Sequence, residues 1–534
     1  MIKRELAGLM VALAVLLAAV AGTEAGEPKR GGTLTYTLHP EPTALSTIAT
    51  TAIPVATIAS KIYESLLEYE GPFLTPRPGL AESWSVSPDH TVYTFKLQRG
   101  VKWHDGTPFT SGDVKISIEK VVKPYHSRGA AYFGQLERVE TPDPLTVVFR
   151  LKQPVPYFLK AFQPTESPIL PKHVLDKLDL SDAKSVRQSE LMQKPIGTGP
   201  FRLQEWKRGS HIILERNPTY WKPGRPYLDR IVLRVIPDGA ARAIALENGE
   251  VDLVPMSSVP PAEIARLAAL GHVARSDKGT EGLGPIMWLE INLRKAPLSD
   301  VRVRRAISLA LDRKKITNVI WFGQGKPATS PIVSGGQYHD KSLKPFEHDP
   351  GKANALLDEA GYRRGPAGVR FKLVQNYQPY GESWVRQAEF IKQELGKIGI
   401  EVETQSLDFG AWLKRIFTDW DYEFTANSSH NYADPSIGVQ RVFHSGNIKR
   451  GASYTNSMGY TNKRADELFD QAAVETDGAK RERLFAEIQQ ILREELPVVP
   501  LMELDWIQLW NKRVHGLITN GISIYTGWDS VWVE

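Results

Sequence analysis

Cysteine is absent from all 534 residues of the chain. Disulfide bonds, thiolate metal sites and a catalytic thiol are therefore excluded. A lipoprotein anchor is excluded as well, because lipidation requires a cysteine at the signal cleavage point. The fold must then depend on buried apolar area alone, and a chain of this length is expected to form two or three packed units.

The chain also lacks a strong charge of either sign. Its 66 Lys and Arg residues nearly balance its 61 Asp and Glu residues, which leaves a formal charge of +5. No basic block is long enough to indicate a nucleic-acid-binding surface. We therefore expect no nucleic-acid partner.

Long apolar runs are absent beyond the N-terminus. The first run covers residues 6–21, follows two basic residues and ends in the small residues that signal peptidase reads. It is shorter than the about 20 residues that a membrane span needs. We predict a signal peptide over residues 1–21, with cleavage after Ala21 or after Ala25, and export to the periplasm.

Catalytic signatures are missing too. No two of the 12 His residues are close enough for a His-Glu-x-x-His zinc helix, and the phosphate-binding and serine-nucleophile glycine motifs do not occur. His104-Asp105-Gly106 places a carboxylate beside a His, but adjacent residues of an extended chain point in opposite directions, which favours a polar turn. We expect no catalytic residue, metal site or cofactor. Two functions remain open alternatives to solute binding: a secreted hydrolase with an unrecognised set of catalytic residues, and a periplasmic chaperone-like binder.

What the chain does contain is a regular succession of strand and helix patterns. Residues 33–38 alternate as a half-buried strand does. Residues 68–190 hold closely spaced strands with Pro, Asp and Gly turns, which predicts a small antiparallel unit. After residue 200 the rhythm is strand–helix–strand, which predicts parallel sheets covered by helices. Residues 286–292 and 497–502 are predicted to cross between lobes and form a hinge.

Capping residues predict where several helices begin. Asp238, Asp300 and Asp349 each precede a helical pattern, and Ser111 is expected to cap a shorter helix. A long helix from about residue 464 to residue 492 is expected to break near Asp477-Gly478.

Several short motifs follow one another in the order of a known family. They are Leu80–Trp84, Tyr93–Thr110, Gly197–Phe201, Asn217–Trp221, Gly249–Asp252 and Val301–Asp312. The chain resembles the peptide/nickel-binding family of extracellular solute-binding proteins of ABC importers over nearly its whole length. This resemblance implies a monomeric binding protein, without catalysis, that closes over a small solute and delivers it to a membrane permease.

The resemblance also implies the α/β fold of periplasmic binding proteins. Two lobes are joined by a two-segment hinge, and the first lobe carries an inserted β-rich domain. We expect the first lobe to comprise residues 31–67, 190–285 and 503–534. The inserted domain is expected over residues 68–189 and the second lobe over residues 286–502.

Two positions of the resemblance concern the ligand's charges. Dipeptide and oligopeptide binders place an Asp, four residues before a Pro, against the peptide's amino terminus, and that position holds Asn431 here. An Arg that holds the carboxylate in dipeptide binders is matched by Gln378. Both replacements keep hydrogen bonds and lose the charge. Asp434 and Arg386 could take over the two charges, or the ligand is a sugar, an opine or a nickel complex instead of a peptide.

Four further residues are candidates for the ligand cleft. Phe409 stands where relatives place an aromatic wall, and Trp412 follows it, although Trp412 could equally pack a helix face. His39 and Glu41 follow the first strand, where ligand loops of the family lie, and a plain surface loop is the alternative for both.

Overall fold

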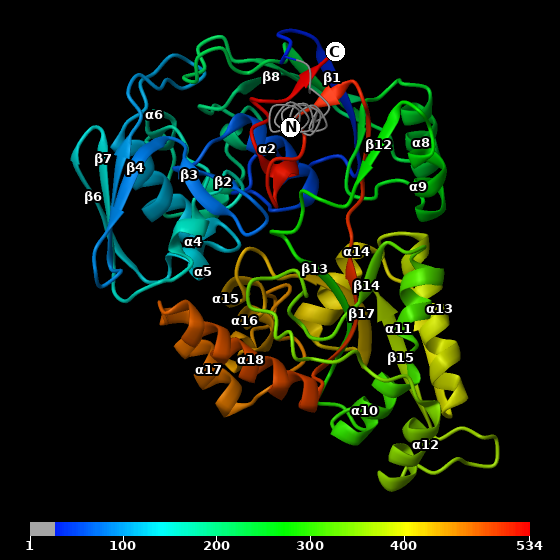
Figure 1. Cartoon of the computed structure of the whole chain (residues 1–534). Coiled ribbons are helices and arrows are strands. Elements are labelled where there is room, and N and C mark those ends of the chain that lie inside the picture. The colour runs from blue at the N-terminus through cyan, green and yellow to red at the C-terminus, as the bar shows by residue number, and fades with distance from the viewer. Residues whose placement is uncertain (1–26) are drawn as a thin grey trace, which may run out of the picture.

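The computed structural model of the protein describes residues 27–534, which form two stacked α/β lobes (Figure 1). The predicted signal peptide, residues 1–21, lies outside the described residues. Strands β1 (Thr33–Leu38) and β21 (Trp532–Val533) contact each other, so both ends of the described chain belong to one lobe, here called the first lobe. Within residues 27–534, no helix has the length and apolar character to cross a membrane.

A seven-stranded sheet organises the first lobe, in the order β12-β19-β11-β1-β10-β9-β8. Its central strand β1 alternates as predicted over residues 33–36, where Leu34 and Tyr36 are buried, but Thr37 is buried as well as Leu38 because the strand lies inside the sheet. The other strands are β8 (Phe201–Lys207), β9 (His211–Arg216), β10 (Arg230–Val235), β11 (Leu253–Val254), β12 (Val273–Ser276) and β19 (Gln508–Asn511). Helices α2 (Ile53–Ile62), α8 (Gly239–Glu247) and α9 (Pro261–Ala268) accompany this sheet, and β20 (Val514–His515) pairs with β21.

This sheet is mixed, so the prediction of a parallel sheet was wrong in part. The strand–helix–strand unit β10–α8–β11 does give two parallel pairings, but both are made with β1, which lies between the two strands. Strand β9 pairs antiparallel with both β8 and β10, and the connection of residues 208–210 between β8 and β9 is too short for a parallel crossover.

A smaller antiparallel sheet, ordered β4-β5-β7-β6, is inserted between α2 and β8 and lies at the left of the first lobe in Figure 1. Five Phe rings pack in its core with centroid separations of 5.1 to 6.0 Å: Phe95, Phe133, Phe149, Phe158 and Phe162. The antiparallel pairing predicted for this stretch is confirmed, whereas the domain boundaries stay a prediction. The strands of the region are β2 (Leu67–Glu70), β3 (Thr75–Pro78), β4 (Ala81–Val86), β5 (Val92–Leu97), β6 (Leu136–Asp143) and β7 (Thr146–Leu151), and its helices are α3 (Ser111–Ile116), α4 (Lys123–Tyr125), α5 (Gly129–Phe133), α6 (Lys172–Leu175) and α7 (Ala183–Arg187).

The second lobe is built on a six-stranded sheet in the order β14-β18-β13-β17-β15-β16. It too is mixed, because β15 pairs in parallel with β16 and β17 while the remaining pairs are antiparallel. The strands are β13 (Pro285–Ile291), β14 (Gly325–Pro327), β15 (Phe371–Tyr377), β16 (Ile400–Gln405), β17 (Phe424–His430) and β18 (Val498–Leu504). The helices are α10 (Val301–Ala310), α11 (Arg313–Lys315), α12 (Pro350–Glu359), α13 (Glu382–Lys397), α14 (Phe409–Leu413), α15 (Pro435–Gly438), α16 (Gln440–Phe443), α17 (Lys463–Val474) and α18 (Gly478–Glu495).

Two segments of chain connect the sheets of the two lobes. They are residues 277–284, between β12 and β13, and residues 505–507, between β18 and β19. The prediction placed both crossings too far into the second lobe, since residues 286–292 and 497–502 belong mainly to β13 and β18, which pair with each other. A strand buried on both faces has a continuous apolar sequence, and that pattern was mistaken for a crossing.

The helix boundaries follow the predicted capping residues with one exception. The carboxylates of Asp238, Asp300 and Asp349 each accept a hydrogen bond from a backbone N–H in the first turn of the helix that follows. Asp477 caps α18, so the predicted break in the long helix is confirmed. The helix expected to be capped by Ser111 begins at that residue, and Thr110 and Asp113 form its capping box instead.

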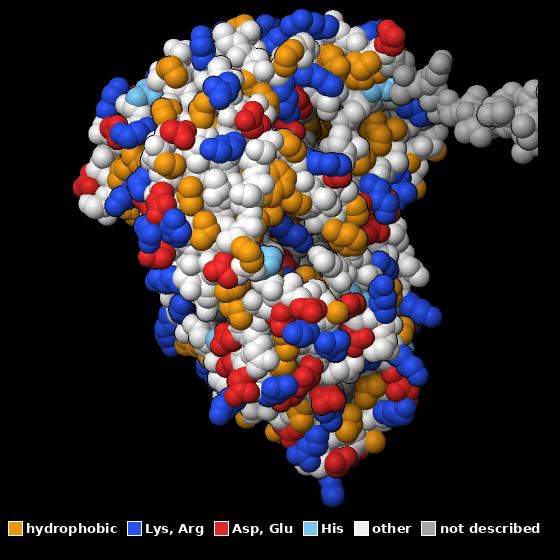
Figure 2. Space-filling model, turned by 60° about the vertical axis from the view of Figure 1, so that its left-hand side comes forward, with side chains coloured by type: hydrophobic (Ala, Val, Ile, Leu, Met, Phe, Trp, Pro, Cys, Tyr) orange, Lys and Arg blue, Asp and Glu red, His pale blue; other side chains and the backbone are white. Residues whose placement is uncertain are grey.

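Charges of both signs cover the surface. On the face shown in Figure 2, basic and acidic side chains are interspersed over both lobes, and no large area carries one sign. This distribution agrees with the near balance of charges in the sequence and offers no continuous basic track on that face.

Candidate ligand-binding site

The end of β17 is the point at which the second lobe meets the crossing segments. Immediately after this strand, the backbone N–H groups of Asn431 and Tyr432 donate to the carbonyl oxygens of Gly284 and Leu283. The His430 ring lies 5.1 Å, centroid to centroid, from the ring of Trp506 in the other crossing segment. The end of β17 is therefore attached to both segments that join the lobes, to one through its backbone and to the other through the His430 side chain.

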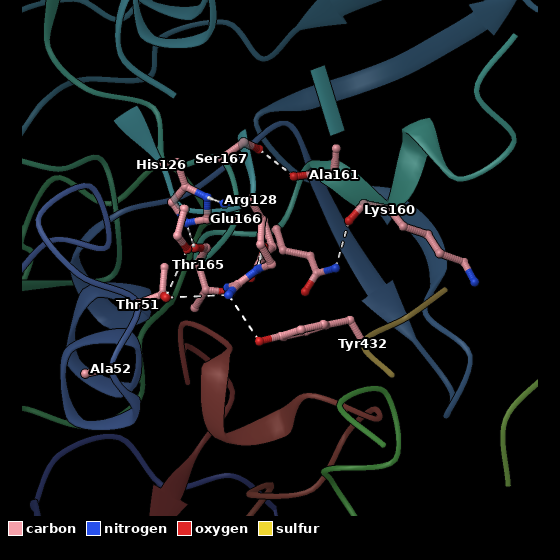
Figure 3. A network of polar contacts seen from close by, with 12 residues as sticks. Thr51, Ala52, His126, Arg128, Lys160, Ala161, Thr165, Glu166, Ser167 and Tyr432 are labelled. Carbon is pink, nitrogen blue, oxygen red and sulfur yellow. Dashed lines mark hydrogen bonds and ion pairs between the residues drawn. The ribbon is translucent and has the colours of Figure 1, made fainter. Parts of the chain in front are cut away.

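A network of polar contacts connects this strand end to the first lobe (Figure 3). Arg128 donates to both carboxylate oxygens of Glu166, through Nε and Nη2, at 2.5 Å each. Its Nη1 donates to the hydroxyl of Tyr432 at 3.2 Å, and the guanidinium lies 4.5 Å from the centre of that ring. Burial alone would raise the pKa of Glu166, but the charge and hydrogen bonds of Arg128 keep it below its usual value.

Two further contacts hold the lobes together beside this network. Lys160 Nζ donates to the carbonyl oxygen of Ala433 at 2.8 Å. Helix α5 of the first lobe contacts α15 of the second, and the fully buried Ile437 of α15 joins the hydrophobic core of the first lobe. The two lobes therefore already share a polar and an apolar contact in this conformation.

Asp434, a predicted ligand residue, forms a buried ion pair within the second lobe. Its two carboxylate oxygens accept from Nη1 and Nη2 of Arg481 at 2.6 and 2.7 Å, and both side chains are at most 2% exposed. Burial would raise the pKa of Asp434, but the charge of Arg481 lowers it. Asp434 also accepts from the N–H of Ser436 and so caps α15. Both oxygens of this carboxylate thus have partners inside the protein.

Gln378 and Asn431 lie at the same edge of the second sheet, because β15 and β17 are parallel neighbours and each residue directly follows its strand. The amide of Gln378 donates to the hydroxyl of Tyr454 at 3.1 Å and accepts from the hydroxyl of Ser428 at 2.7 Å. The amide of Asn431 accepts from Val333 N–H and donates to the carbonyl oxygen of Pro331. The structure brings the two residues to one edge, with both side chains hydrogen-bonded.

The two aromatic candidates differ sharply in exposure. Phe409 is 39% exposed and its ring is stacked between those of Tyr380 and Trp412, at centroid distances of 5.4 and 6.0 Å. Trp412 is fully buried and its indole N–H donates to the hydroxyl of Thr425 at 3.0 Å. Phe409 can offer the exposed part of its ring to a ligand, whereas Trp412 supports that ring from within the core.

The candidates from the first lobe occupy the loop after β1. Glu41 accepts from the indole N–H of Trp206 and from the backbone N–H of Gly209, both at 3.0 Å, which fixes the loop to the turn between β8 and β9. His39 is largely exposed. Partial desolvation of its ring, and after it the charge of Arg242, lowers its pKa. Within residues 27–534, no hydrogen bond joins these two side chains to the candidates of the second lobe.

His104-Asp105-Gly106 is the polar turn that the sequence favoured. The His104 ring makes contacts with Gly197 and Gly199, while Asp105 pairs with His173 at 2.6 Å. The neighbouring carboxylate therefore does not orient the His104 ring.

Sequence reasoning missed the residues that contact one another across the lobes. Arg128 reaches Glu166, 38 residues away, and Tyr432, 304 residues away, and no local pattern reveals such pairs. His430 and Tyr432 could have been found, since they flank Asn431. Nε2 of His430 is buried and has no hydrogen-bond partner among the described residues, which is typical of a site that a bound molecule or water completes.

Residues 75–450 match the model of a protein family described as bacterial extracellular solute-binding proteins, family 5 middle. The chain belongs to this family. Its relatives include periplasmic substrate-binding components of ABC transporters, and family 5 consists of binding proteins.

Relatives of known name cover most of the chain. The oligopeptide-binding protein AppA of Bacillus subtilis is 29% identical over 513 residues, which cover 92% of this chain and 91% of AppA. The dipeptide-binding protein of Escherichia coli is 27% identical over 477 residues, 86% of each chain.

Solved structures of family 5 proteins share the two-lobed periplasmic-binding-protein fold. AppA of Bacillus subtilis in complex with a nonapeptide has a TM-score of 0.82 and 26% identity, and the match covers 95% of this chain and all of AppA. The binding protein AgaA from A. tumefaciens R10 in complex with agropinic acid has a TM-score of 0.78 and 29% identity, covering 94% of this chain and 99% of AgaA.

Proposed function

We propose that this family 5 protein captures a peptide or peptide-like solute between its lobes and delivers it, chemically unaltered, to the membrane permease of an ABC transporter. One observation supports this above the others: the residues at the end of β17, which flank the candidate Asn431, contact both crossing segments and the first lobe. A ligand bound there would contact both lobes only when they are closed, and would shift the population toward the closed state.

The proposed ligand contacts come mainly from the second lobe. Phe409 supplies an exposed ring, and Gln378 and Asn431 supply amides at one sheet edge. Trp412 and Asp434 support these positions through their buried contacts. His39 and Glu41 are proposed contacts from the first lobe, on the loop after β1.

An opine is the second candidate ligand. The structure of AgaA holds agropinic acid, and the sequence identity of AgaA to this chain, 29%, equals that of the oligopeptide-binding protein AppA of Bacillus subtilis. The replacement of the expected Asp and Arg by Asn431 and Gln378 also favours a ligand other than a simple zwitterionic dipeptide. A bare metal ion has less support, because within residues 27–534 no three His, Asp or Glu side chains are placed to hold one.

The remaining parts of the proposal concern location and assembly. We infer a periplasmic monomer, exported with cleavage of residues 1–21, with no nucleic-acid partner and no catalytic activity. A secreted hydrolase is the rival, and incubation of the purified protein with peptides and esters, followed by mass spectrometry, would reveal product if it were correct.

Thermal unfolding with a panel of dipeptides, oligopeptides, opines, sugars and nickel complexes tests the proposal. A true ligand at 100 times its dissociation constant should stabilise the folded protein by about 2.7 kcal/mol, because it binds only the folded state. Stabilisation by saccharides alone would contradict the peptide assignment, and a panel without any stabilising solute would contradict capture itself.

Phe409→Ala should weaken binding of the solute found in that panel by about tenfold, or about 1.4 kcal/mol, because the ligand loses an apolar contact with the exposed part of the ring. The free energy of unfolding should change little, since the ring is partly exposed. Phe322→Ala is a suitable control, because Phe322 is 42% exposed in the same lobe. Isothermal titration calorimetry measures both variants, and equal affinities for the two would remove Phe409 from the site.

A further inference from the structure

The charges around the end of β17 do not cancel. Four cationic side chains gather there, Arg128 and Lys160 from the first lobe and Arg441 and Arg481 from the second. The carboxylates that these cations contact are Glu166 and Asp434. Among these groups, the junction of the lobes therefore carries an excess of positive charge.

Both of these carboxylates are already engaged. Glu166 takes two hydrogen bonds from Arg128, and Asp434 takes two from Arg481. Neither therefore has a free oxygen pair for a ligand's ammonium group. Lys160, for its part, donates to the carbonyl oxygen of Ala433.

Arg441, in α16, is the cation with the fewest partners. Its Nη2 donates to the carbonyl oxygen of Ser453 at 3.0 Å, and within the described residues its guanidinium forms no ion pair. Burial, and after it the charge of Arg128, lowers the pKa of Arg441. A guanidinium carries five N–H donors and remains charged, so a partly buried one is stabilised by an anion.

The surroundings of Arg441 are those of the candidate site. Ser453 adjoins Tyr454, whose hydroxyl accepts from the amide of Gln378 at 3.1 Å. The resemblance to dipeptide binders matches Gln378 to the Arg that holds the ligand's carboxylate in those proteins. Hydrogen bonds therefore link Arg441 of α16 to Gln378, which follows β15, through the neighbouring residues Ser453 and Tyr454.

A second observation points to a bound molecule at the same place. The buried Nε2 of His430 has no partner among the described residues. The charges of Arg128 and Arg441 act on this ring, which, with burial as the larger cause, lowers its pKa to about 4. The ring is therefore neutral at the pH of the periplasm, and a positive field surrounds it.

We propose that Arg441 binds a carboxylate of the ligand through a two-pronged hydrogen-bonded ion pair, and that the site selects solutes with a free carboxylate without requiring an ammonium group. The inference rests on the proposed capture of a solute between the lobes. The carboxylate belongs either to a peptide C-terminus or to an opine, and both present the planar acceptor pair that a guanidinium fits.

Calorimetric titration of the full mature chain with four probes tests this assignment. The probes are the dipeptide Ala-Phe, N-acetyl-Ala-Phe, Ala-Phe amide and agropinic acid. We expect binding by a free-carboxylate probe, equal affinity for the acetylated and free dipeptide if peptides are the source, and loss of at least about 30-fold for the amide. Binding of agropinic acid alone would instead assign the carboxylate to an opine.

Variants separate Arg441 from other arginines. Arg441→Gln should weaken the bound free-carboxylate probe by about 30- to 100-fold. Arg441→Lys should weaken it less, because the charge remains while the paired donors are lost. Arg415→Gln is the matched control on the second lobe, since Arg415 contacts Gln405 and should leave affinity unchanged. Unfolding midpoints without ligand show whether each variant folds.

Three results would overturn the inference. They are equal binding of acid and amide, unchanged affinity in Arg441→Gln, or a loss caused by Arg386→Gln in place of Arg441→Gln. In each of these cases a solute still binds, so the proposed function stands. If no acid probe binds while a neutral solute stabilises the wild-type protein, Arg441 is likewise excluded and capture is retained. If no solute of either panel binds, both proposals fail together.

Discussion

Asp434→Ala should lower the free energy of unfolding by about 3–5 kcal/mol, because it leaves the buried guanidinium of Arg481 without its carboxylate. Arg481 is 2% exposed, and its remaining partners are neutral: the hydroxyls of Tyr338 and Ser436 and the carbonyl oxygen of Ala472. Water cannot take the place of the lost charge at such a buried position. Urea-induced unfolding followed by Trp fluorescence measures the change.

The matched control is Asp300→Ala. Asp300 also caps a helix and also pairs with an Arg, but that pair is partly exposed. Its loss should cost about 1 kcal/mol, the usual value for a helix cap. The double variant Asp434→Ala/Arg481→Met should recover much of the loss, since the unpaired charge is removed as well. Equal costs for Asp434→Ala and Asp300→Ala, or no recovery in the double variant, would contradict the buried ion pair.

These contacts also bear on what Asp434 does for the ligand. A carboxylate held by two hydrogen bonds from Arg481 contributes little net charge to the site. Its place before α15 instead fixes the segment that carries Tyr432 toward Arg128. We therefore expect Asp434→Asn to change the position of this segment, and with it the closed state, more than the charge presented to a ligand.

The elements of the fold were predictable where the pattern is local. Alternation over residues 33–38 gives β1, and the carboxylates of Asp238, Asp300 and Asp349 begin their helices as a capping residue should. Whether neighbouring strands pair in parallel or antiparallel was harder to predict from the sequence. It depends on which strand is inserted beside which, and β1 lies between two strands that follow it by about two hundred residues.

The site was predictable only in part, for a similar reason. Gln378 and Asn431 could be placed at one edge because each ends a strand. That their amides would be used by Tyr454 and by the loop at Pro331 depends on contacts about 75 to 100 residues distant. Phe409 and Trp412 lie one helical turn apart and look alike in sequence, and only tertiary packing buries one of them and exposes the other.

Between pH 4 and pH 8 the free energy of unfolding of the wild-type protein should fall by about 3 kcal/mol relative to that of the Glu64→Gln variant. Glu64 is buried in the first lobe, and burial raises its pKa from 4.5 to about 7 against the opposing charge of Lys222. Between these two values the folded state keeps a proton that the unfolded state has lost. The folded state is therefore favoured at low pH, and the advantage is lost as the pH rises through 7.

The Gln variant isolates this proton because it keeps the carbonyl oxygen that can accept from Tyr220 and Trp221 and removes the titration. Glu70→Gln serves as the control, since Glu70 forms an exposed pair with Arg77, and such pairs contribute little. Its pH profile should parallel that of the wild type. Unfolding free energies at four pH values decide the matter, and parallel curves for wild type and Glu64→Gln would mean that the Glu64 carboxyl has the same pKa in the folded and the unfolded protein. A wild-type stability that falls relative to Glu64→Gln as the pH rises would instead show that burial of this carboxyl outweighs the attraction of Lys222, 158 residues further along the chain.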